Sequence, residues 1–296
     1  MTGFYTSRYW LPLFVVSVLV PSPVEAEELP VPTTVHYPSP DDALERFAWL
    51  GESSTFSVRI LGSEALRAGI EIGDLSLDSE FGAVIPMHIV GTTVGLLDTI
   101  YPVDNESLTL LDPENGLLPI YTDSDYNERD YVTRLVVNYD RDRYTHRVLR
   151  IEPDEPNVEE FASVPMDVYD DLAAVYDVRS RDLTPGNGYV YHTHDGAEFA
   201  RTTVTIIRTE EVFAEGFGYV DCAVLAWVIE PLESTPLVPF GETPLPPTTR
   251  AGGPANYVAL SYISLDERRL LIGGDIQTSL GMMTIRLVDR RAGSTP

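Results

Sequence analysis

The segment YVTRLVVNYDRDRYTHRVLRI, residues 131–151, sets the pattern of the chain. In its first half every second residue, from Tyr131 to Tyr139, falls on the same side, and this period of two is typical of a half-buried β-strand. The charged run Asp140–Arg143 interrupts the alternation before a second apolar stretch begins at Tyr144. The segment therefore predicts two antiparallel strands joined by a hairpin turn.

The same pattern recurs elsewhere and decides the predicted fold class. Asp266–Arg269 separates two more apolar stretches, which makes it a second predicted hairpin turn. Further strands are predicted at Phe56–Ile60, Gly188–Thr193, Phe199–Thr209, Cys222–Ile229, Ala259–Leu265, Leu270–Ile276 and Met282–Val288. We therefore expect an all-β fold, a mostly antiparallel curved sheet forming an open barrel or a sandwich, with one or two short helices.

One segment has helical periodicity instead. Between Asp167 and Arg179 the apolar residues recur at the spacing of one helix face, at Val168, Leu172, Val175 and Tyr176. We expect Asp167 to cap this helix, Asp170 to complement its dipole, and Pro185-Gly186 to prevent its continuation. A second, weaker helix is predicted at Ala43–Leu50, and Thr92–Tyr101 fits either a helix or a strand.

The amino-terminal residues are typical of an exported bacterial protein. Arg8 supplies a positive charge, Trp10–Val20 forms an apolar stretch too short to span a bilayer, and Ala26 offers a small residue for cleavage. We therefore predict a signal peptide at residues 1–26 and a periplasmic or extracellular protein without a stable membrane anchor.

The remaining chain is expected to form one domain. Residues 27–51 make a Pro-rich leader with a short helix, and its Pro-rich part up to Asp41 is predicted to be a surface strap or tether without regular structure. Residues 52–290 are predicted to form a single β-rich domain, interrupted by a second Pro-rich segment at 231–256. Such a long insert is typical of a functional or disordered loop.

Charge and cysteine usage exclude some functions. The chain has 46 acidic against 20 basic residues and a formal net charge of −26, and every basic residue is Arg. Nucleic acids and anionic lipid surfaces repel such a protein because both are polyanions. The single Cys222 lies in an apolar run, which predicts a buried, inert thiol rather than a nucleophile.

The order of three segments resembles a known bacterial family. The segments are Asp167–Arg179 followed by Leu183–Gly186, the strand pair Tyr189–Ile207 with Asp195-Gly196 between the strands, and Tyr262–Ile272 followed by Gly281–Leu287. Together they resemble the exported family called domain of unknown function 3108, over a match expected to span Glu52–Val288. The resemblance implies a mostly antiparallel β domain in the envelope and no established reaction. The chain departs from the family by its Pro-rich insert and by Tyr262, where Trp is expected.

Two short motifs suggest metal sites. His192, His194 and Asp195 place two imidazoles on one face of a strand beside a carboxylate, which is compatible with zinc, although two surface histidines before a turn explain the same residues.

The run Asp123–Asp130 begins like a calcium loop. Its candidate ligands are Asp123, Asp125 and Asn127, but Glu128 and Arg134 stand where an EF-hand requires Gly and Glu. An ordinary acidic loop is the alternative, and no cofactor is predicted.

The residues Asp170, Tyr176 and Arg179 form the local group that we expect to matter most. Asp170 and Arg179 lie nine positions apart in the sequence, on different faces of the predicted helix, and cannot pair along it. Arg179 is expected to reach a strand carboxylate or a carbonyl at the helix end, as a structural clamp. A ligand contact by the three residues is the alternative.

Two classes of function fit these observations. The first is a non-catalytic binding or assembly protein that holds a lipid, a glycan or a protein partner of the envelope. The second is a hydrolase or lyase that acts on envelope polysaccharide. A metal-dependent version requires His192 and His194 to converge with Asp or Glu from elsewhere in the chain. Recognisable catalytic motifs are absent from the sequence, so the binding class is favoured.

Overall fold

The computed structural model describes residues 31–37, 49–129, 131–140, 145–151, 158–163, 167–194, 199–232, 257–278 and 281–291. Within these residues the chain forms two short helices, α1 (Gly95–Ile100) and α2 (Asp171–Arg179). The strands are β1 (Thr34–His36), β2 (Ser53–Ile60), β3 (Ser63–Ile72), β4 (Ser76–Asp78), β5 (Gly82–Thr93), β6 (Asp104–Asp112), β7 (Leu118–Glu128), β8 (Tyr131–Asp140), β9 (Thr145–Ile151), β10 (Val158–Ser163), β11 (Val168–Tyr169), β12 (Asn187–His194), β13 (Phe199–Ala214), β14 (Gly218–Leu232), β15 (Tyr257–Ser264), β16 (Leu271–Thr278) and β17 (Gly281–Arg291). The predicted all-β class is confirmed.

The strands form one continuous, mostly antiparallel sheet. It runs from β10 through β9, β8, β7, β6, β5, β3 and β2 to β17, and from there through β16, β15, β14 and β13 to β12. Both predicted hairpins are present, because β8 pairs with β9 and β15 pairs with β16. The pairing of β17 with β2 joins the two halves of the sheet, so residues far apart in the sequence share one framework.

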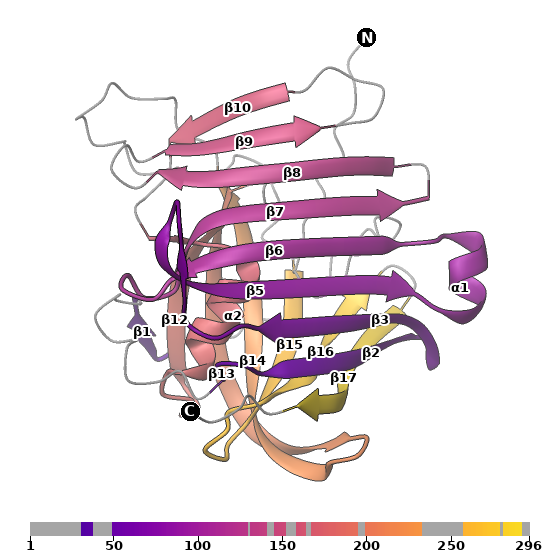
Figure 1. Ribbon diagram of the computed structural model, residues 1–296. Helices are drawn as coiled ribbons and strands as arrows, with labels where there is room; N and C mark the ends of the chain where they lie inside the picture. The colour runs from indigo at the N-terminus through magenta and orange to yellow at the C-terminus, as the bar shows by residue number, and fades with distance from the viewer. Residues whose placement is uncertain are drawn as a thin grey trace.

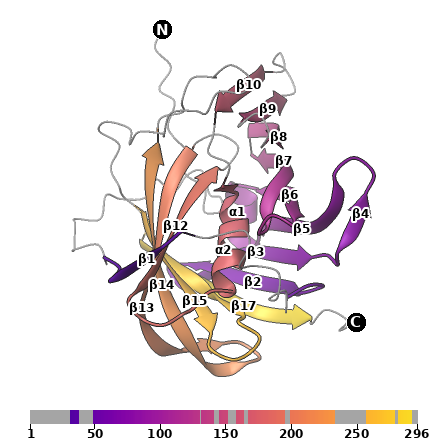
Figure 2. The same ribbon diagram turned by 90° about the vertical axis from the view of Figure 1, so that its left-hand side faces the viewer.

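The sheet curves so strongly that its two halves face each other. Figure 2 shows one wall made by β5–β10 and the other by β12–β15, with α2 between them. Register shifts mark irregular points in several ladders, at Val58/Arg59, Leu110/Leu111, Ile206/Arg208, Tyr262/Ile263 and Leu287/Asp289. An extra residue at such a point bends its strand and increases the local twist, which allows a wide sheet to curl. The predicted curved sheet is therefore confirmed.

Helix α2 lies inside this curve and is buried on every side. Each residue from Leu172 to Arg179 is buried, and the small side chains of Ala173 and Ala174 are fully enclosed. A surface helix would bury one stripe and leave the other face polar. The predicted apolar residues Leu172, Val175 and Tyr176 are buried, and charged residues of this helix are buried as well.

The start of α2 also differs from the prediction. The carboxylate of Asp170 accepts a hydrogen bond from the amide of Ala173 at 2.6 Å, so Asp170 rather than Asp167 caps the helix. Val168 and Tyr169 instead form β11, which pairs in parallel with β12. β-Branched and aromatic residues suit such a strand, and a carboxylate immediately after them is placed to begin the helix.

Two other local predictions are corrected. The segment Asp123–Glu128, predicted as a loop, belongs to β7, where Ser124 and Glu128 are buried on one face while Asp125 is exposed on the other. Polar side chains on both faces conceal the apolar alternation that marks a strand. The ambiguous Thr92–Tyr101 contains the end of β5 and then α1. In the predicted helix Ala43–Leu50, residues 43–48 lie outside the described part of the chain.

Part of the leader is a strand at the sheet edge. The amide of Thr33 donates to the carbonyl of Gly186 at 2.9 Å, and Thr34–His36 then pair in parallel with β12 as the exposed strand β1. A Cβ at Gly188 would collide with the ring of Pro32, so this glycine allows the close approach. Residues Thr34–His36 of the leader thus have regular structure, contrary to the prediction, because they are not prolines and keep their backbone amides. The predicted signal peptide and residues 233–256 of the Pro-rich insert lie outside the described residues.

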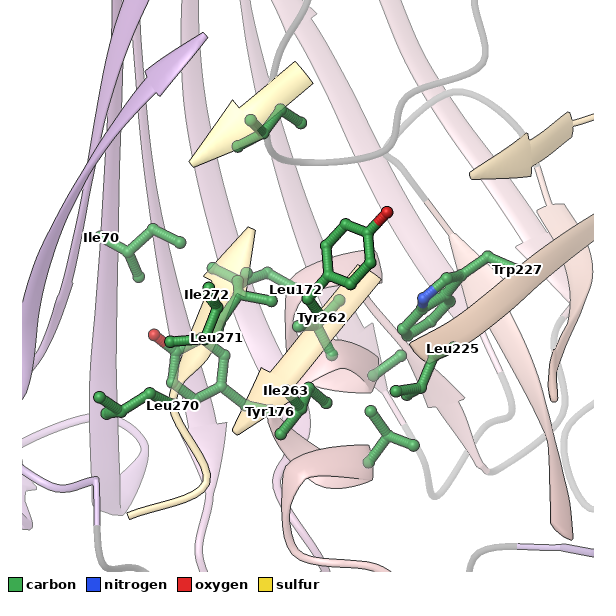
Figure 3. Packing of buried hydrophobic residues seen from close by; sticks show 14 of the residues in the cluster. Ile70, Leu172, Tyr176, Leu225, Trp227, Tyr262, Ile263, Leu270, Leu271 and Ile272 are labelled. Atoms are coloured by element: carbon green, nitrogen blue, oxygen red, sulfur yellow. The ribbon is translucent and has the colours of Figure 1, made fainter. Parts of the chain in front are cut away.

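The main core forms where α2 meets β14, β15 and β16. Figure 3 shows Leu172 and Tyr176 of the helix among apolar side chains of these strands. The indole nitrogen of Trp227 donates to the hydroxyl of Ser261 at 2.7 Å, so this buried polar atom is satisfied. Cys222 is buried, as predicted, and burial raises the pKa of its thiol to about 12. Such a thiol stays protonated and unreactive at neutral pH.

The backbone at Gly273 gives a direct test of the close packing in β16. Gly273 has φ of 148°, and an added Cβ would overlap the carbonyl of Ile285 on the neighbouring strand. We expect Gly273→Ala to lower the free energy of unfolding by about 3 kcal/mol or more, because strain and a backbone collision add. Gly91→Ala is the matched control, since an added Cβ there meets no atom within 4 Å. Urea denaturation of both variants measures the difference, and an equal effect of the two substitutions would contradict the packing described.

Candidate functional site

The guanidinium of Arg179 lies in the interior and holds three segments together. It donates to both carboxylate oxygens of Glu52, at 3.1 and 3.0 Å, and its Nε donates to the carbonyl of Arg269 at 2.7 Å. Arg290 also donates to Glu52, at 3.3 Å. Arg179 and Glu52 are each 1% exposed, so this ion pair is shielded from water. Arg179 was expected to reach a strand carboxylate or a carbonyl at the helix end; the structure pairs it with the carboxylate of Glu52, immediately before β2, and with a carbonyl in the turn after β15.

Tyr176 belongs to the same cluster. Its ring lies 4.5 Å from the Cζ atom of Arg179, a cation–π contact, and meets the ring of Trp49 edge to face at 5.2 Å between centroids. Burial raises the pKa of Tyr176 above its ordinary value. The phenol therefore stays neutral, and it has no use as a general base at physiological pH.

A second buried cluster lies next to the first and was not predicted. The carboxylate of Asp177 accepts hydrogen bonds from Arg181 at 2.8 and 2.9 Å and from the hydroxyl of Tyr191 at 2.8 Å. Asp177 and Arg181 stand four positions apart, the spacing at which charged side chains meet on a helix, so the pair was detectable in the sequence. Burial and the nearby Asp177 both raise the pKa of Tyr191.

Asp170 lies at the opposite end of α2 from Arg179. Burial raises its pKa, and the hydrogen bond from the amide of Ala173 acts against that rise. Of the predicted group, the structure therefore brings Tyr176 and Arg179 together and leaves Asp170 apart as a helix cap. The three residues do not surround one point, so they cannot contact a single small ligand together.

The predicted zinc residues have different surroundings. The Nδ1 of His192 lies 3.4 Å from a carboxylate oxygen of Asp167, and its imidazole stacks on Phe199 at 5.9 Å. His194 is buried, and burial lowers its pKa to about 4. Asp195 lies outside the described residues. In the part of the chain that the structure describes, no three His, Cys, Asp or Glu residues are grouped to hold a metal. Zinc binding stays a prediction.

The predicted calcium ligands follow one another along β7. Asp123 is bound at both oxygens by Arg134, at 2.8 and 2.6 Å, while Arg134 lies 4.0 Å from the mostly exposed Asp125. The backbone amide of Asn127 donates to the side chain of Asn105 at 3.0 Å, and the side chain of Asn127 is exposed. Arg134 holds the pKa of Asp123 below its usual value. Calcium binding stays a prediction, and it would require Asp123 to leave Arg134.

A small apolar pocket lies next to α2. It has a volume of about 20 Å³ and is lined by apolar atoms of Val175, Trp227, Leu271 and their neighbours. That space is about the size of one water molecule. Neither of the described helices is long and apolar enough to cross a membrane.

Comparisons with known proteins identify relatives of unknown function. A family model described as "Protein of unknown function (DUF3108)" matches residues 55–236. A β-barrel-like protein of the domain of unknown function DUF1849 from Brucella abortus is similar in structure, with a TM-score of 0.47 and 10% identity over 84% of this chain and 100% of that one. A "putative lipoprotein" from Parabacteroides distasonis is similar with a TM-score of 0.30 and 7% identity, over 84% of this chain and 99% of that one. No curated protein matches the sequence. The predicted family resemblance is confirmed, although the model match ends before Tyr262.

The buried Arg179–Glu52 pair should control stability. Arg179→Met leaves Glu52 charged beside Arg290 alone in a buried site, and we expect it to lower the free energy of unfolding by about 3–5 kcal/mol. The double variant with Glu52→Gln should lose less than the sum of the two single losses, because no unpaired charge remains. Arg134→Met, at a half-exposed pair with Asp123, is the control and should cost about 1 kcal/mol or less. Urea denaturation measures all four proteins, and additive losses in the double variant would contradict a coupled pair.

The buried His194 predicts a loss of stability in acid. Its pKa in the folded state is about 4, below the ordinary 6.5. Between pH 4 and pH 6.5 the imidazole is therefore protonated in the unfolded chain but neutral in the folded chain. The contribution of His194 to the free energy of unfolding is therefore complete above pH 6.5. As the pH falls towards 4, this contribution is lost, by about 3 kcal/mol in total. His194→Gln should show a flatter loss of stability than the wild type between pH about 7.5 and about 4.5. Parallel loss in both proteins would show that another group is responsible.

Proposed function

Because the chain belongs to the DUF3108 family of proteins of unknown function, we propose from its own geometry that it is a non-catalytic binding or assembly protein of the bacterial cell envelope. The predicted signal peptide supports a periplasmic or extracellular location. In this role the curved sheet is a rigid frame, and its surface presents side chains to a lipid, a glycan or a protein of the envelope.

One observation carries the proposal. The buried charged side chains around α2 are all engaged in contacts within the fold, with Arg179 bound to Glu52 and Asp177 bound to Arg181 and Tyr191. A catalytic acid or base must be free to contact its substrate, and its pKa must lie near the working pH. These groups instead tie the helix to the sheet, which favours a structural use of the interior.

The small pocket beside Val175 does not suit the proposed ligands. A space of about 20 Å³ next to Val175 accommodates no lipid chain or sugar ring. We place the ligand instead on side chains that point outwards from the sheet.

The alternative, a polysaccharide hydrolase or lyase, requires carboxylates that converge in a cleft. No specific contact among the described residues favours it over binding. An experiment can distinguish the two functions, because a binding protein leaves its ligand intact whereas a hydrolase or lyase cleaves it.

We expect the protein to leave purified envelope polysaccharide at its original chain length, and to retain an intact lipid, glycan or protein partner when it is isolated gently from its own envelope. Size-exclusion chromatography of the polysaccharide and native mass spectrometry of the protein measure the two outcomes. Heat-denatured protein is the control. Shortening of the polysaccharide by native but not by denatured protein would replace the binding function with the enzymatic one.

A further inference from the structure

The hairpin made by β13 and β14 is the longest in the described part of the chain, with strands of 16 and 15 residues. Figure 1 shows its closed end below the rest of the sheet. Along β13 the side chains alternate near this end, so that Val212 and Ala214 are buried whereas Glu211 and Phe213 are exposed. One side of the hairpin thus packs on the protein, and the other side is free.

The free side carries an exposed pair of aromatic rings. Phe213 lies opposite Tyr219 in the ladder, and the ring centroids are 5.5 Å apart at an angle of 64°. The two residues are 57% and 74% exposed. Exposed aromatic side chains that contact each other leave much apolar area in water, and such residues are enriched at protein interfaces.

Two carboxylates lie beside these rings on the same side. Glu211 is the ladder partner of Asp221, and both residues are exposed. Like charges directly opposite each other in a sheet are destabilising. Among the described residues no cation forms an ion pair with either carboxylate, since the nearby Arg208 donates to Glu210 at 2.8 Å instead. Within the described part of the protein, no ion pair with a cation offsets the repulsion between these two carboxylates.

We propose that Glu211, Phe213, Tyr219 and Asp221, together the hairpin face, are a docking surface for an Arg-containing segment of a partner protein. A guanidinium between the two carboxylates relieves their repulsion, and its planar surface stacks on the neighbouring rings. This inference rests on the proposed binding function and names the class of its partner.

Charge complementarity favours this occupant. The chain has a net charge of −26, and the neighbouring Glu215 is 71% exposed with Arg59 as its cation at 3.9 Å. Anionic lipid headgroups are repelled by such a surface, whereas a basic polypeptide is attracted to it. The edge-to-face geometry of the rings gives no single flat platform for a sugar ring.

The test uses the full mature protein and a fluorescein-labelled peptide of alternating Gly and Arg residues. We expect the double variant Glu211→Gln/Asp221→Asn to bind this peptide about tenfold more weakly than the wild type, and the double variant Phe213→Ser/Tyr219→Ser to lose a similar factor. Fluorescence anisotropy measures the binding. All four positions are exposed, so thermal denaturation should show folded variants.

A matched control separates a local surface from diffuse attraction. Glu71→Gln/Asp74→Asn removes the same charge from two exposed positions outside the hairpin, and it should weaken binding less than about twofold. An equal loss in this control would overturn the proposal, because net charge alone would then explain the binding. Strong binding that is insensitive to the two aromatic substitutions would overturn it as well.

Two further outcomes would assign the hairpin face to another occupant. Binding of phosphatidylglycerol vesicles that is lost in Phe213→Ser/Tyr219→Ser would indicate a lipid surface, and a dimer lost in the same variant would indicate a second copy of the chain. Either result overturns the Arg-segment proposal while the binding function stands. Cleavage of envelope polysaccharide would have the opposite effect, since it contradicts the binding function without moving the peptide affinities.

Discussion

The hydrogen-bonded ion pair between Arg179 and Glu52 is the contact on which the rest of the structure depends. It joins the end of α2 to the residue before β2, and the same guanidinium reaches the carbonyl of Arg269 in the turn after β15. Removing two charges from water is costly, and the cost is offset only when nearly every donor and acceptor is paired. The neighbouring Arg290 and Tyr176 provide further contacts, so the pair requires that the helix, both halves of the sheet and the turn occupy fixed positions.

This constraint determines where function can lie. Helix α2 lies between the two walls of the curved sheet, and its side chains are part of the main hydrophobic core there. Polar groups of the helix are used within the fold, and the pocket beside Val175 is about 20 Å³. We therefore propose that recognition takes place at the outer surface, where the hairpin face combines exposed rings with two carboxylates that lie opposite each other in the ladder.

The sequence alone predicted the curved antiparallel sheet, the two hairpins and the contact of Arg179 with a carboxylate. These features depend on local alternation, on turn residues and on the geometry of one helix. It could not identify Glu52, because the partners are separated by 127 positions and one acidic residue among 46 has no distinguishing context. The Asp123–Glu128 part of β7 was missed because its two faces carry mostly polar side chains. The cap was assigned to Asp167 because the strand character of Val168 and Tyr169 appears only when β12 lies beside them.

Hydrogen–deuterium exchange of the intact protein tests most directly whether α2 is a fixed part of the frame. If the buried pairs hold the helix in place, amides in Ala174–Val178 exchange as slowly as those in the centre of β14, in one cooperative unit. Fast exchange of these helix amides while β14 stays protected would contradict the account. It would mean that the helix leaves the interior without unfolding the sheet, and that the space between the two walls is open to a ligand.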